Sequence, residues 1–360
     1  MFRRLITAAS ALSLAGALAT AVPAAAQAPA GSSCDRTCLK GLADSLVASI
    51  VAHRPGDAPL TPYYKATDNG VPASVAFMDL WRTITAAGER QYYLDPVSGQ
   101  AFVIVSVKEG QVPSLLWGRL KADGRRLSEV ELYLTRSRGD AGFIFGNGTL
   151  DQLPAAWTRP VAPSRLPKRD ELLRIGKAMF DPTLPLPPSG PDCALIENGG
   201  VVKEEAEWMS YGDMPAPPPA KAGAGQSVAM TGMGCPLFPG RPGDEHARVD
   251  VVDTDQGVVV SLASLEGLIY NYPVTDPTWS AFVPNSLRGM HEASLKKALA
   301  TGRYRDRPKV VTMPASILVG QLFRVYDGKV QGFHMVQKLA PTGARSPWTL
   351  PTIDAPGNGR

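Results

Sequence analysis

The feature that most constrains the fold of this 360-residue chain is an internal repeat. Residues 63–136 contain a short turn, an Asp-containing hairpin and a closing pair of strands, and residues 190–340 repeat that order with longer insertions. The matched turns are Asn69-Gly70 with Asn198-Gly199, and Asp123-Gly124 with Asp327-Gly328. Because each half carries its own turns and apolar strands, the repeat predicts two copies of one small domain, so that any pocket would occur twice.

The N-terminus has the three parts of a secretory signal. Arg3 and Arg4 precede an apolar run over residues 5–22, and Ala26-Gln27-Ala28 supplies the small residues that a signal peptidase accepts. We therefore expect a signal peptide over residues 1–28 and an exported mature chain, periplasmic or extracellular. An uncleaved membrane anchor is the alternative, because the apolar run approaches spanning length. No later stretch of the sequence is long enough, so we expect no membrane span after cleavage.

The four cysteines predict two disulfides, because thiols oxidise in exported proteins. Local pairing, Cys34 with Cys38 and Cys193 with Cys235, is the economical choice. The second bond would close a loop of about 40 residues, which stabilises the fold by roughly 4 kcal/mol in the chain-entropy model. A metal site would need further thiolate or imidazole ligands, and His53 is the only one near the first pair. We therefore expect no metal.

Recognised motifs exclude several classes of function. The sequence contains no Walker loop, dinucleotide fingerprint, nucleophile elbow or spaced His/Cys cluster, so we expect no cofactor. The net charge of +4 includes the two signal arginines, and no dense Lys/Arg stripe with interleaved aromatics occurs, so nucleic acid is not an expected partner. A small molecule is the expected partner, and a homo-oligomer stays open.

Periodicity predicts an α+β fold. Apolar stripes at three- and four-residue spacing predict helices over residues 35–52, 73–87 and 168–180. Alternation then predicts an antiparallel meander in the first half, with strands at 91–94, 101–109, 114–121 and 127–135. The strands of the second half are expected at 194–197, 248–252, 258–265, 316–325 and 330–339. An insertion between Ser264 and Ser316, with a helix over 285–301, is either a lid or interface element or an inert decoration.

This order of helix, strand turn, helix and bent meander resembles the cone-shaped α+β fold of the nuclear transport factor two and SnoaL superfamily. The whole mature chain is similar to a family of exported proteins of uncharacterised function that carry two such domains in tandem. The residues that carry the resemblance are Cys34 to Leu39, Asp68-Asn69-Gly70, Leu80-Trp81, Asp95-Pro96 with Gly99-Gln100, Pro191-Asp192-Cys193, Glu197-Asn198-Gly199, Gly234-Cys235 and Ser346-Pro347-Trp348.

The resemblance implies two tandem cone-shaped domains, each with N-terminal helices packed on a bent antiparallel sheet. The expected divisions are a first domain over 29–140, a linker over 141–166, a second domain with long insertions over 167–342 and a C-terminal tail over 343–360. The chain departs from the family at Leu265-Glu266-Gly267, where an Asp-His pair is expected, and this puts an acid-base role there in doubt.

In the cone fold, the concave sheet and the first helices enclose an apolar pocket that holds a few polar groups. Glu129 and Glu131 alternate with apolar neighbours on the last strand of the first half, so they share one face. That face is either exposed to solvent, with the carboxylates paired to Arg119 or Lys121 on the neighbouring strand, or turned into the cavity beside Trp81 and Tyr93. In the cavity, burial would raise the pKa of a carboxyl group.

The repeat places His334 of the second half near the position of Glu131. Imidazole suits proton transfer near neutral pH, although a lone histidine on a strand is also commonly a packed residue. Glu266, Tyr270 and Tyr272 lead into the insertion and either form the mouth of a second pocket or belong to the core.

Three functions follow from these patterns. The first is an exported protein that binds a small apolar or aromatic molecule in a pocket lined by Trp81, Tyr93 and Trp117. The second is a cofactor-independent lyase, isomerase or dehydratase whose general base is His334, Glu131 or Glu129, with a Tyr or Arg partner such as Arg119. The third is a structural or interaction protein whose cones are filled by side chains. The sequence names no reaction, so it leaves open whether the protein is an enzyme.

Overall fold

The computed structural model describes residues 34–136, 150, 153–201, 235, 243–271, 280–289, 292–293, 296 and 311–349. These residues belong to one compact unit, which spans Ser32–Arg360. The expected signal peptide and the last part of the expected tail lie outside the described residues. Among the residues that are described, no helix is long and apolar enough to cross a membrane.

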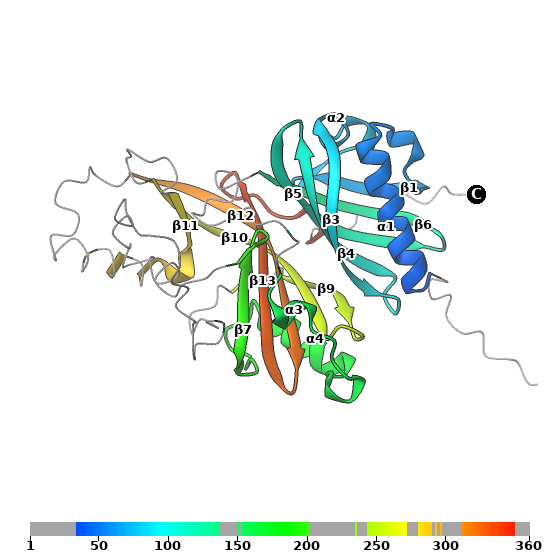
Figure 1. Cartoon of the computed structure of the whole chain (residues 1–360). Helices are drawn as coiled ribbons and strands as arrows, with labels where there is room; N and C mark the ends of the chain where they lie inside the picture. Colours follow the sequence, from blue (N-terminus) through cyan, green and yellow to red (C-terminus); the bar gives the residue numbers. More distant parts are fainter. Residues whose placement is uncertain are drawn as a thin grey trace, which may run out of the picture. The chain divides into compact units, whose positions relative to one another are not determined.

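The first half, residues 34–136, forms a six-stranded mixed sheet with one long helix (Figure 1). The strand order is β2-β1-β6-β5-β4-β3, in which β1 and β6 run parallel and the other pairs run antiparallel. Its elements are α1 (Arg36–Val51), β1 (Leu60–Asp68), β2 (Val71–Pro72), α2 (Leu80–Thr83), β3 (Ile84–Asp95), β4 (Gln100–Glu109), β5 (Val112–Asp123) and β6 (Arg126–Arg136).

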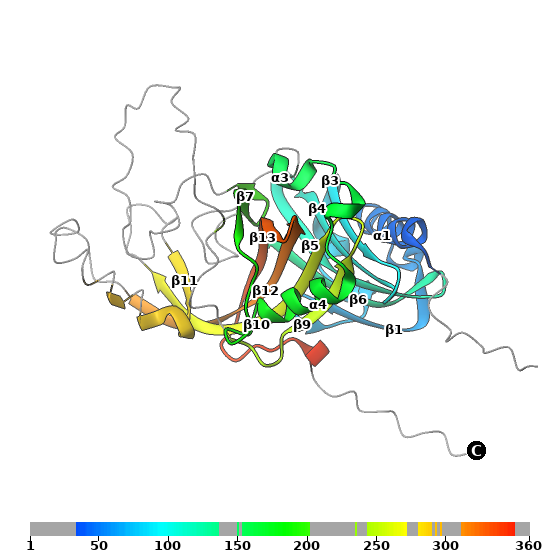
Figure 2. The ribbon, with the colours of Figure 1, turned by 90° about the horizontal axis from the view of Figure 1, so that it is seen from below.

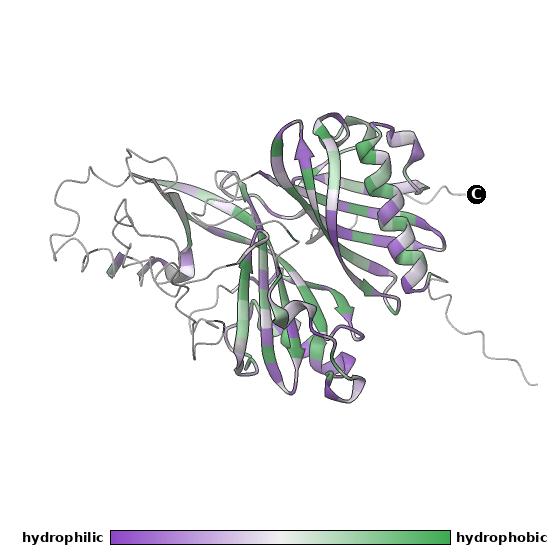
Figure 3. Cartoon of the chain, viewed as in Figure 1, coloured by the Kyte–Doolittle hydropathy of each residue, from purple (hydrophilic) through white to green (hydrophobic). Residues whose placement is uncertain are grey.

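Helix α1 begins where its sequence provides a cap and buries the apolar stripe that predicted it. The Asp35 carboxylate accepts a hydrogen bond of 2.8 Å from the backbone N–H of Cys38, which satisfies one free donor of the first turn. Leu39, Leu46 and Ile50 are buried, and in Figure 3 hydrophobic and hydrophilic residues interleave along the helix. The expected Cys34–Cys38 and Cys193–Cys235 disulfides are both confirmed.

The second half, described within residues 153–349, forms a seven-stranded mixed sheet. The strand order is β11-β10-β12-β13-β7-β8, and β9 pairs with β10 beside β11. Its elements are α3 (Ala155–Thr158), α4 (Arg169–Ala178), β7 (Ser189–Glu197), β8 (Gly200–Val201), β9 (Arg248–Asp253), β10 (Val258–Asn271), β11 (Ser280–Pro284), β12 (Val311–Tyr326) and β13 (Lys329–Ala340).

Apart from the added strand β11 and a bulge in β9, the two sheets share one strand order and one register. In both halves a helix precedes a hairpin, whose longer strand pairs in parallel with the last strand of the sheet. Thr67 pairs with Glu131 in the first sheet, and Ile196 pairs with His334 in the second. The turns that follow are Asn69-Gly70 and Asn198-Gly199, and all four residues have positive φ, the conformation that Asn and Gly tolerate. Glu131 and His334 therefore occupy matched positions.

The structure confirms the α+β class and corrects three details. Residues 73–87 do not form one helix, because Ile84 begins strand β3 and its neighbours pair with β4. The parallel pairing of β1 with β6 was not expected. The closing turns match with a shift of one residue: Asp123 pairs with Arg126 as Tyr326 pairs with Lys329, so Asp123 corresponds to Tyr326 rather than to Asp327.

Three hydrophobic clusters fill the described part of the molecule. The first lies between α1 and the first sheet, and the second lies between α4 and the second sheet. The third joins the opposite faces of the two sheets and includes Phe102, Trp117 and Tyr133 of the first sheet with Val260 and Leu322 of the second. Figure 2 shows α4 against the β9 and β10 ribbons, on the side that carries the second cluster. Each sheet is thus buried on both faces.

Candidate functional site

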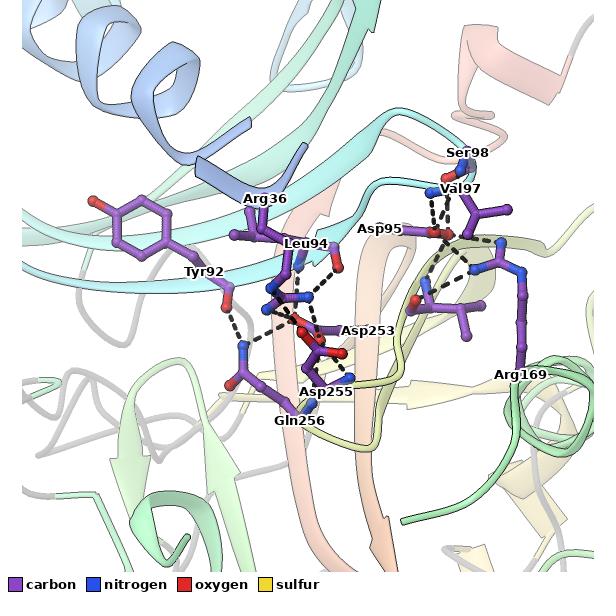
Figure 4. Close-up of polar contacts among 11 residues, drawn as sticks. Arg36, Tyr92, Leu94, Asp95, Val97, Ser98, Arg169, Asp253, Asp255 and Gln256 are labelled. Carbon is purple, nitrogen blue, oxygen red and sulfur yellow. Dashed lines mark hydrogen bonds and ion pairs between the residues drawn. The ribbon is translucent and has the colours of Figure 1, made fainter. Parts of the chain in front are cut away.

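Two reciprocal ion pairs join the two halves, because an arginine of each half binds an aspartate of the other (Figure 4). Arg36, the first residue of α1, donates at 2.8 and 2.9 Å to the two carboxylate oxygens of Asp253 in the other half. Arg169, the first residue of α4, donates at 2.7 and 2.8 Å to those of Asp95. Each contact is therefore repeated with the halves exchanged, as in a self-complementary interface between two copies of one unit.

The two aspartates also stabilise matched turns and the edges of the strands. Asp95 accepts hydrogen bonds from the backbone N–H groups of Val97 and Ser98, and Asp253 accepts from those of Asp255 and Gln256. Across the halves, Leu94 N–H donates to Asp253 and Val252 N–H donates to Asp95. Both carboxylates are buried and fully used by the protein, so we assign them a structural role.

A second cross-half contact is a buried charge cluster, defined as Arg119, Glu129, Glu131, Arg248 and Asp250. Arg119 and Glu131 face each other on β5 and β6, and Arg119 Nε donates to Glu131 Oε2 at 3.0 Å. Arg248, on β9 of the other sheet, donates from Nη2 to both Glu131 oxygens at 2.9 Å. Arg119 also lies 2.7 Å from Glu129. A fully buried glutamate thus holds two guanidinium groups from different halves.

Asp250 enters the buried charge cluster through a β-bulge. The β9–β10 register shifts between Val260 and Ser261, so Asp250 has no partner on β10. Its carboxylate lies 3.6 Å from Arg119 Nε and 3.6 Å from Arg248 Nη2, and its Oδ2 accepts no hydrogen bond. Burial raises the pKa of Asp250 to about 6, against the opposing effect of the two arginines.

The C-terminal segment, residues 344–349, returns from the second sheet and covers this cluster. Ser346 Oγ donates to Glu131 Oε1 at 3.4 Å, and Trp348 Nε1 donates to Thr67 Oγ1 at 3.1 Å. The Arg119 guanidinium lies 4.7 Å from the centroid of the Trp348 ring, a cation–π distance. The segment thereby connects the end of the second half to the last and first strands of the first sheet.

A surface hollow of about 450 Å³ opens beside the cluster and is called the β10 hollow here. Its walls come from the loop before β9, from the middle of β10, from the residues after β11 and from the C-terminal segment. The residues used below are Asp244, His246, Arg248, Glu266, Ser286 and Arg345. Arg248 belongs to both the hollow and the buried charge cluster, so one side chain links surface and interior.

The structure brings some of the expected site residues together. Glu129 and Glu131 share a face with Arg119, and all three meet in the buried charge cluster. Burial raises the pKa of Glu129 but is outweighed by Arg119, which lowers it overall. The solvent-facing alternative does not hold for Glu131, which is 0% exposed because the second half covers it. Glu266 lines the β10 hollow, as expected for the mouth of a second pocket.

The expected aromatic pocket is not assembled. Trp81 packs in the cluster on the α1 side, whereas Tyr93 and Trp117 pack between the two sheets. Trp117 stacks on Tyr133 with 4.2 Å between ring centroids and donates Nε1 to Thr135 at 3.0 Å. None of these aromatic side chains lines the β10 hollow. The side chain of Tyr270 and the whole of Tyr272 lie outside the described residues.

His334 lies between the sheets in an apolar setting. It is 0% exposed, its ring meets Trp157 edge to face at 5.9 Å, and neither ring nitrogen has a hydrogen-bond partner. Burial lowers the pKa of His334 to about 3, so the imidazole is neutral at physiological pH. His334 lines neither the β10 hollow nor the hollows beside α4 and α1.

Sequence reasoning missed Arg248 and Asp250, which lie within the predicted strand 248–252 but were assigned no role. Only an approach of β9 to β5 and β6 brings Arg248 to Glu131 and Asp250 to Arg119, and no local pattern encodes that approach. Ser346 and Trp348 were marked by the family resemblance, although not as contacts of the first sheet. The helix-starting arginines Arg36 and Arg169 carried a detectable signal, because both stand at the same point of the repeat.

Comparison with known proteins adds no family to this geometry. No protein-family model and no curated protein matches this chain.

Proposed function

We propose that this chain is an exported protein that binds a small molecule in the β10 hollow without transforming it. The observation that carries the proposal is the hollow itself, whose volume of about 450 Å³ falls in the range of ligand sites and whose lining includes Arg248. Two hydrogen bonds to the buried Glu131 hold the Arg248 side chain in one orientation. A polar group that is already oriented loses less conformational entropy when it binds a ligand.

Binding is favoured over catalysis because the candidate bases are not free to act. Glu129 is paired with Arg119 at 2.7 Å, and this pairing lowers its pKa and weakens it as a base. Glu131 Oε1 accepts from Tyr133, Arg248 and Ser346, and its Oε2 accepts from Arg119 and Arg248. His334 is buried without a polar partner. A general base must reach the proton that it removes, and neither group has that access.

The site differs from the apolar cone pocket that the resemblance implies. Space between helix and sheet is filled in both halves by the two helix-side clusters. The shared strand order and the reciprocal ion pairs support two copies of one unit, and on this basis we retain tandem SnoaL-like domains as a proposal. Export is supported by the two disulfides together with the signal-like N-terminus.

The filled clusters favour a structural role as the second candidate. In that case the two halves would serve as a scaffold, and the β10 hollow would hold no specific ligand.

The test is a thermal-shift screen of small anions, cations and neutral compounds on the mature chain, because a ligand of the native state raises Tm. Ser286 is exposed at the wall of the hollow, so Ser286→Trp should fill it and abolish the shifts, whereas Ser286→Ala should retain them. Hits that stabilise the Trp variant as well as the wild type would place binding elsewhere. A screen without hits would favour the scaffold.

A further inference from the structure

We propose that the ligand of the β10 hollow carries a carboxylate, which the guanidinium group of Arg248 binds with support from Arg345. This inference rests on the proposed function of that site and specifies its chemistry. It is argued from the hydrogen bonds that each charged side chain at the hollow has already made.

The guanidinium group of Arg248 has one nitrogen that is engaged by the protein, and its Nε is buried without a hydrogen-bond partner. Nη2 donates to both oxygens of Glu131, whereas Nη1 has no partner among the described residues. The Arg248 side chain is 18% exposed, and it lines the hollow. Its geometry is therefore fixed before a ligand arrives, while a donor stays free. A planar guanidinium group in this state matches a carboxylate better than it matches a cation or an apolar group.

Arg345 supplies a second positive group at the same hollow. It stands on the C-terminal segment, and its Nη1 lies 3.5 Å from His246 Nε2. Both side chains are partly exposed, so each can turn towards a bound molecule. Two guanidinium groups that line the same hollow favour a ligand that is negatively charged at one end.

The acidic groups of the hollow are either engaged by the backbone or exposed to water. Asp244 uses both carboxylate oxygens to accept backbone N–H groups, from His246 and from Ser264. Glu245 is 87% exposed, and Glu266 is also exposed, so water screens both charges. Arg345 is exposed and is screened in the same way, so the two charged groups that are shielded from water decide the comparison: Asp244 has both oxygens occupied, whereas Arg248 keeps a free donor.

Asp250 couples this site to protons. It competes for the same guanidinium group, at 3.6 Å from Arg248 Nη2, and a bound carboxylate would add a like charge beside it. Burial already raises the pKa of Asp250 to about 6, so ligand binding should shift Asp250 towards its protonated form. Affinity should then rise as pH falls through this range. The other charged or titratable groups that face Asp250 are Arg119 on β5, Glu129, Glu131 and Tyr133 on β6, and Arg248 on β9.

The experiment is isothermal titration calorimetry of the full mature chain with three probes: benzoate, benzylammonium and inorganic phosphate. Benzoate and benzylammonium match in size and differ in charge. We expect benzoate to bind, and to bind roughly tenfold more tightly near pH 5 than near pH 8, because one proton is linked to binding. Asp250→Asn should remove most of this pH dependence, whereas His246→Gln should leave it in place.

Variants test the guanidinium groups without losing the fold. Arg345 is exposed, so Arg345→Gln should weaken benzoate binding several-fold, whereas Arg82→Gln on α2, also exposed, should leave it unchanged. Because removing Arg248 alone strands the Glu131 charge, it is replaced together with its partner, as Arg248→Gln with Glu131→Gln. This double variant should lose benzoate binding.

Three results would overturn the inference. They are benzylammonium binding in preference to benzoate, phosphate binding in preference to benzoate, and benzoate binding that is unchanged in the double variant. In each of these cases a ligand blocked by Ser286→Trp would still support the proposed function. The two proposals would be rejected together if calorimetry showed no preference for benzoate and if no compound in the thermal-shift screen were blocked by Ser286→Trp.

Discussion

Glu131 and His334 stand at the same backbone position in the two halves, yet one is ionic and the other is apolar. Glu131 is met across the sheets by Arg248, and His334 is met by Trp157. The neighbouring residue on the adjacent strand is Arg119 in the first half and Leu322 in the second. The comparison shows that one fold unit can build either environment, and that the choice is made largely by side chains that the other half and the connecting segments contribute.

Close packing reinforces the apolar version. A Cβ atom on Gly332 would lie 2.7 Å from the Trp157 indole, so the absence of a side chain at this position leaves room for the tryptophan that covers His334. In the first half, the corresponding cover is the C-terminal segment, which contributes Ser346 and Trp348. Trp157, which covers His334, is buried, whereas the C-terminal segment, which covers Glu131, forms a wall of the β10 hollow.

The largest expected effect breaks the ionic half of the comparison. Arg248→Met removes a cation from the fully buried Glu131 and should cost about 3–5 kcal/mol in the free energy of unfolding, measured by urea denaturation. Adding Glu131→Leu should recover most of this loss, because the stranded charge is then gone. A single variant as stable as the wild type would show that Glu131 does not depend on Arg248.

The next effect compares the matched carboxyls of β1 and β7. Asp68 and Glu197 occupy the same register, but Glu197 is fully buried, and burial raises its pKa to about 8 despite its hydrogen bond from Gln337. The folded state then binds a proton that the unfolded state has released, so stability falls as pH rises from about 4.5 to about 8.

Glu197→Gln should therefore stabilise the protein near pH 8, on the order of 2–4 kcal/mol, and should have little effect near pH 4. Asp68→Asn provides the matched variant and should show a smaller gain, because Asp68 is only partly buried and receives a hydrogen bond from the Asp79 backbone. Thermal unfolding across pH measures both. Equal gains would contradict the difference in burial.

The reciprocal ion pairs test how equal the two halves are. Arg36→Met and Arg169→Met each leave a buried aspartate without its guanidinium partner and should each cost about 1–3 kcal/mol. The two bidentate contacts match, and the additional pair of Arg36 with Asp255 is exposed and contributes little, so the two losses should agree within about 0.5 kcal/mol in urea denaturation. A clear inequality would show that the two-fold relation does not extend to energetics.

The smallest effect concerns His334. His334→Leu should change stability near pH 7 by no more than about 1 kcal/mol, because the neutral ring makes no hydrogen bond. Since burial lowers the pKa of His334 to about 3, the wild type loses stability as pH falls below about 6.5, where the unfolded state gains a proton. The Leu variant should lose less over this range. A large loss at neutral pH would restore a polar role for His334.

The sequence contained enough local information for much of the fold. Alternation over residues 101–109 and 127–135 identified strands β4 and β6, and the apolar stripe of α1 located that helix within a residue at each end. The helix prediction for residues 73–87 was wrong. Phe77, Leu80 and Trp81 have helical spacing, but from Ile84 onwards the chain pairs with β4 and forms strand β3.

The site was less accessible to prediction than the strands. Glu129, Glu131 and Arg119 were found because cross-strand pairing on β5 and β6 follows from local register. Arg248 and Asp250 were not, because their role depends on packing between the two sheets and on a bulge. The α+β class could be predicted in this way, but which face of the sheet is buried by the other half could not.

The reach of the charged contacts along the chain sets an order on folding. Glu131 pairs with Arg248, which lies 117 positions later in the sequence, and Arg36 pairs with Asp253, which lies 217 positions later. When the first half emerges from synthesis, Glu131 can pair with Arg119, but its second guanidinium partner has not yet been made. Long-range contacts close large loops, so we expect these ionic contacts between the halves to form late in folding.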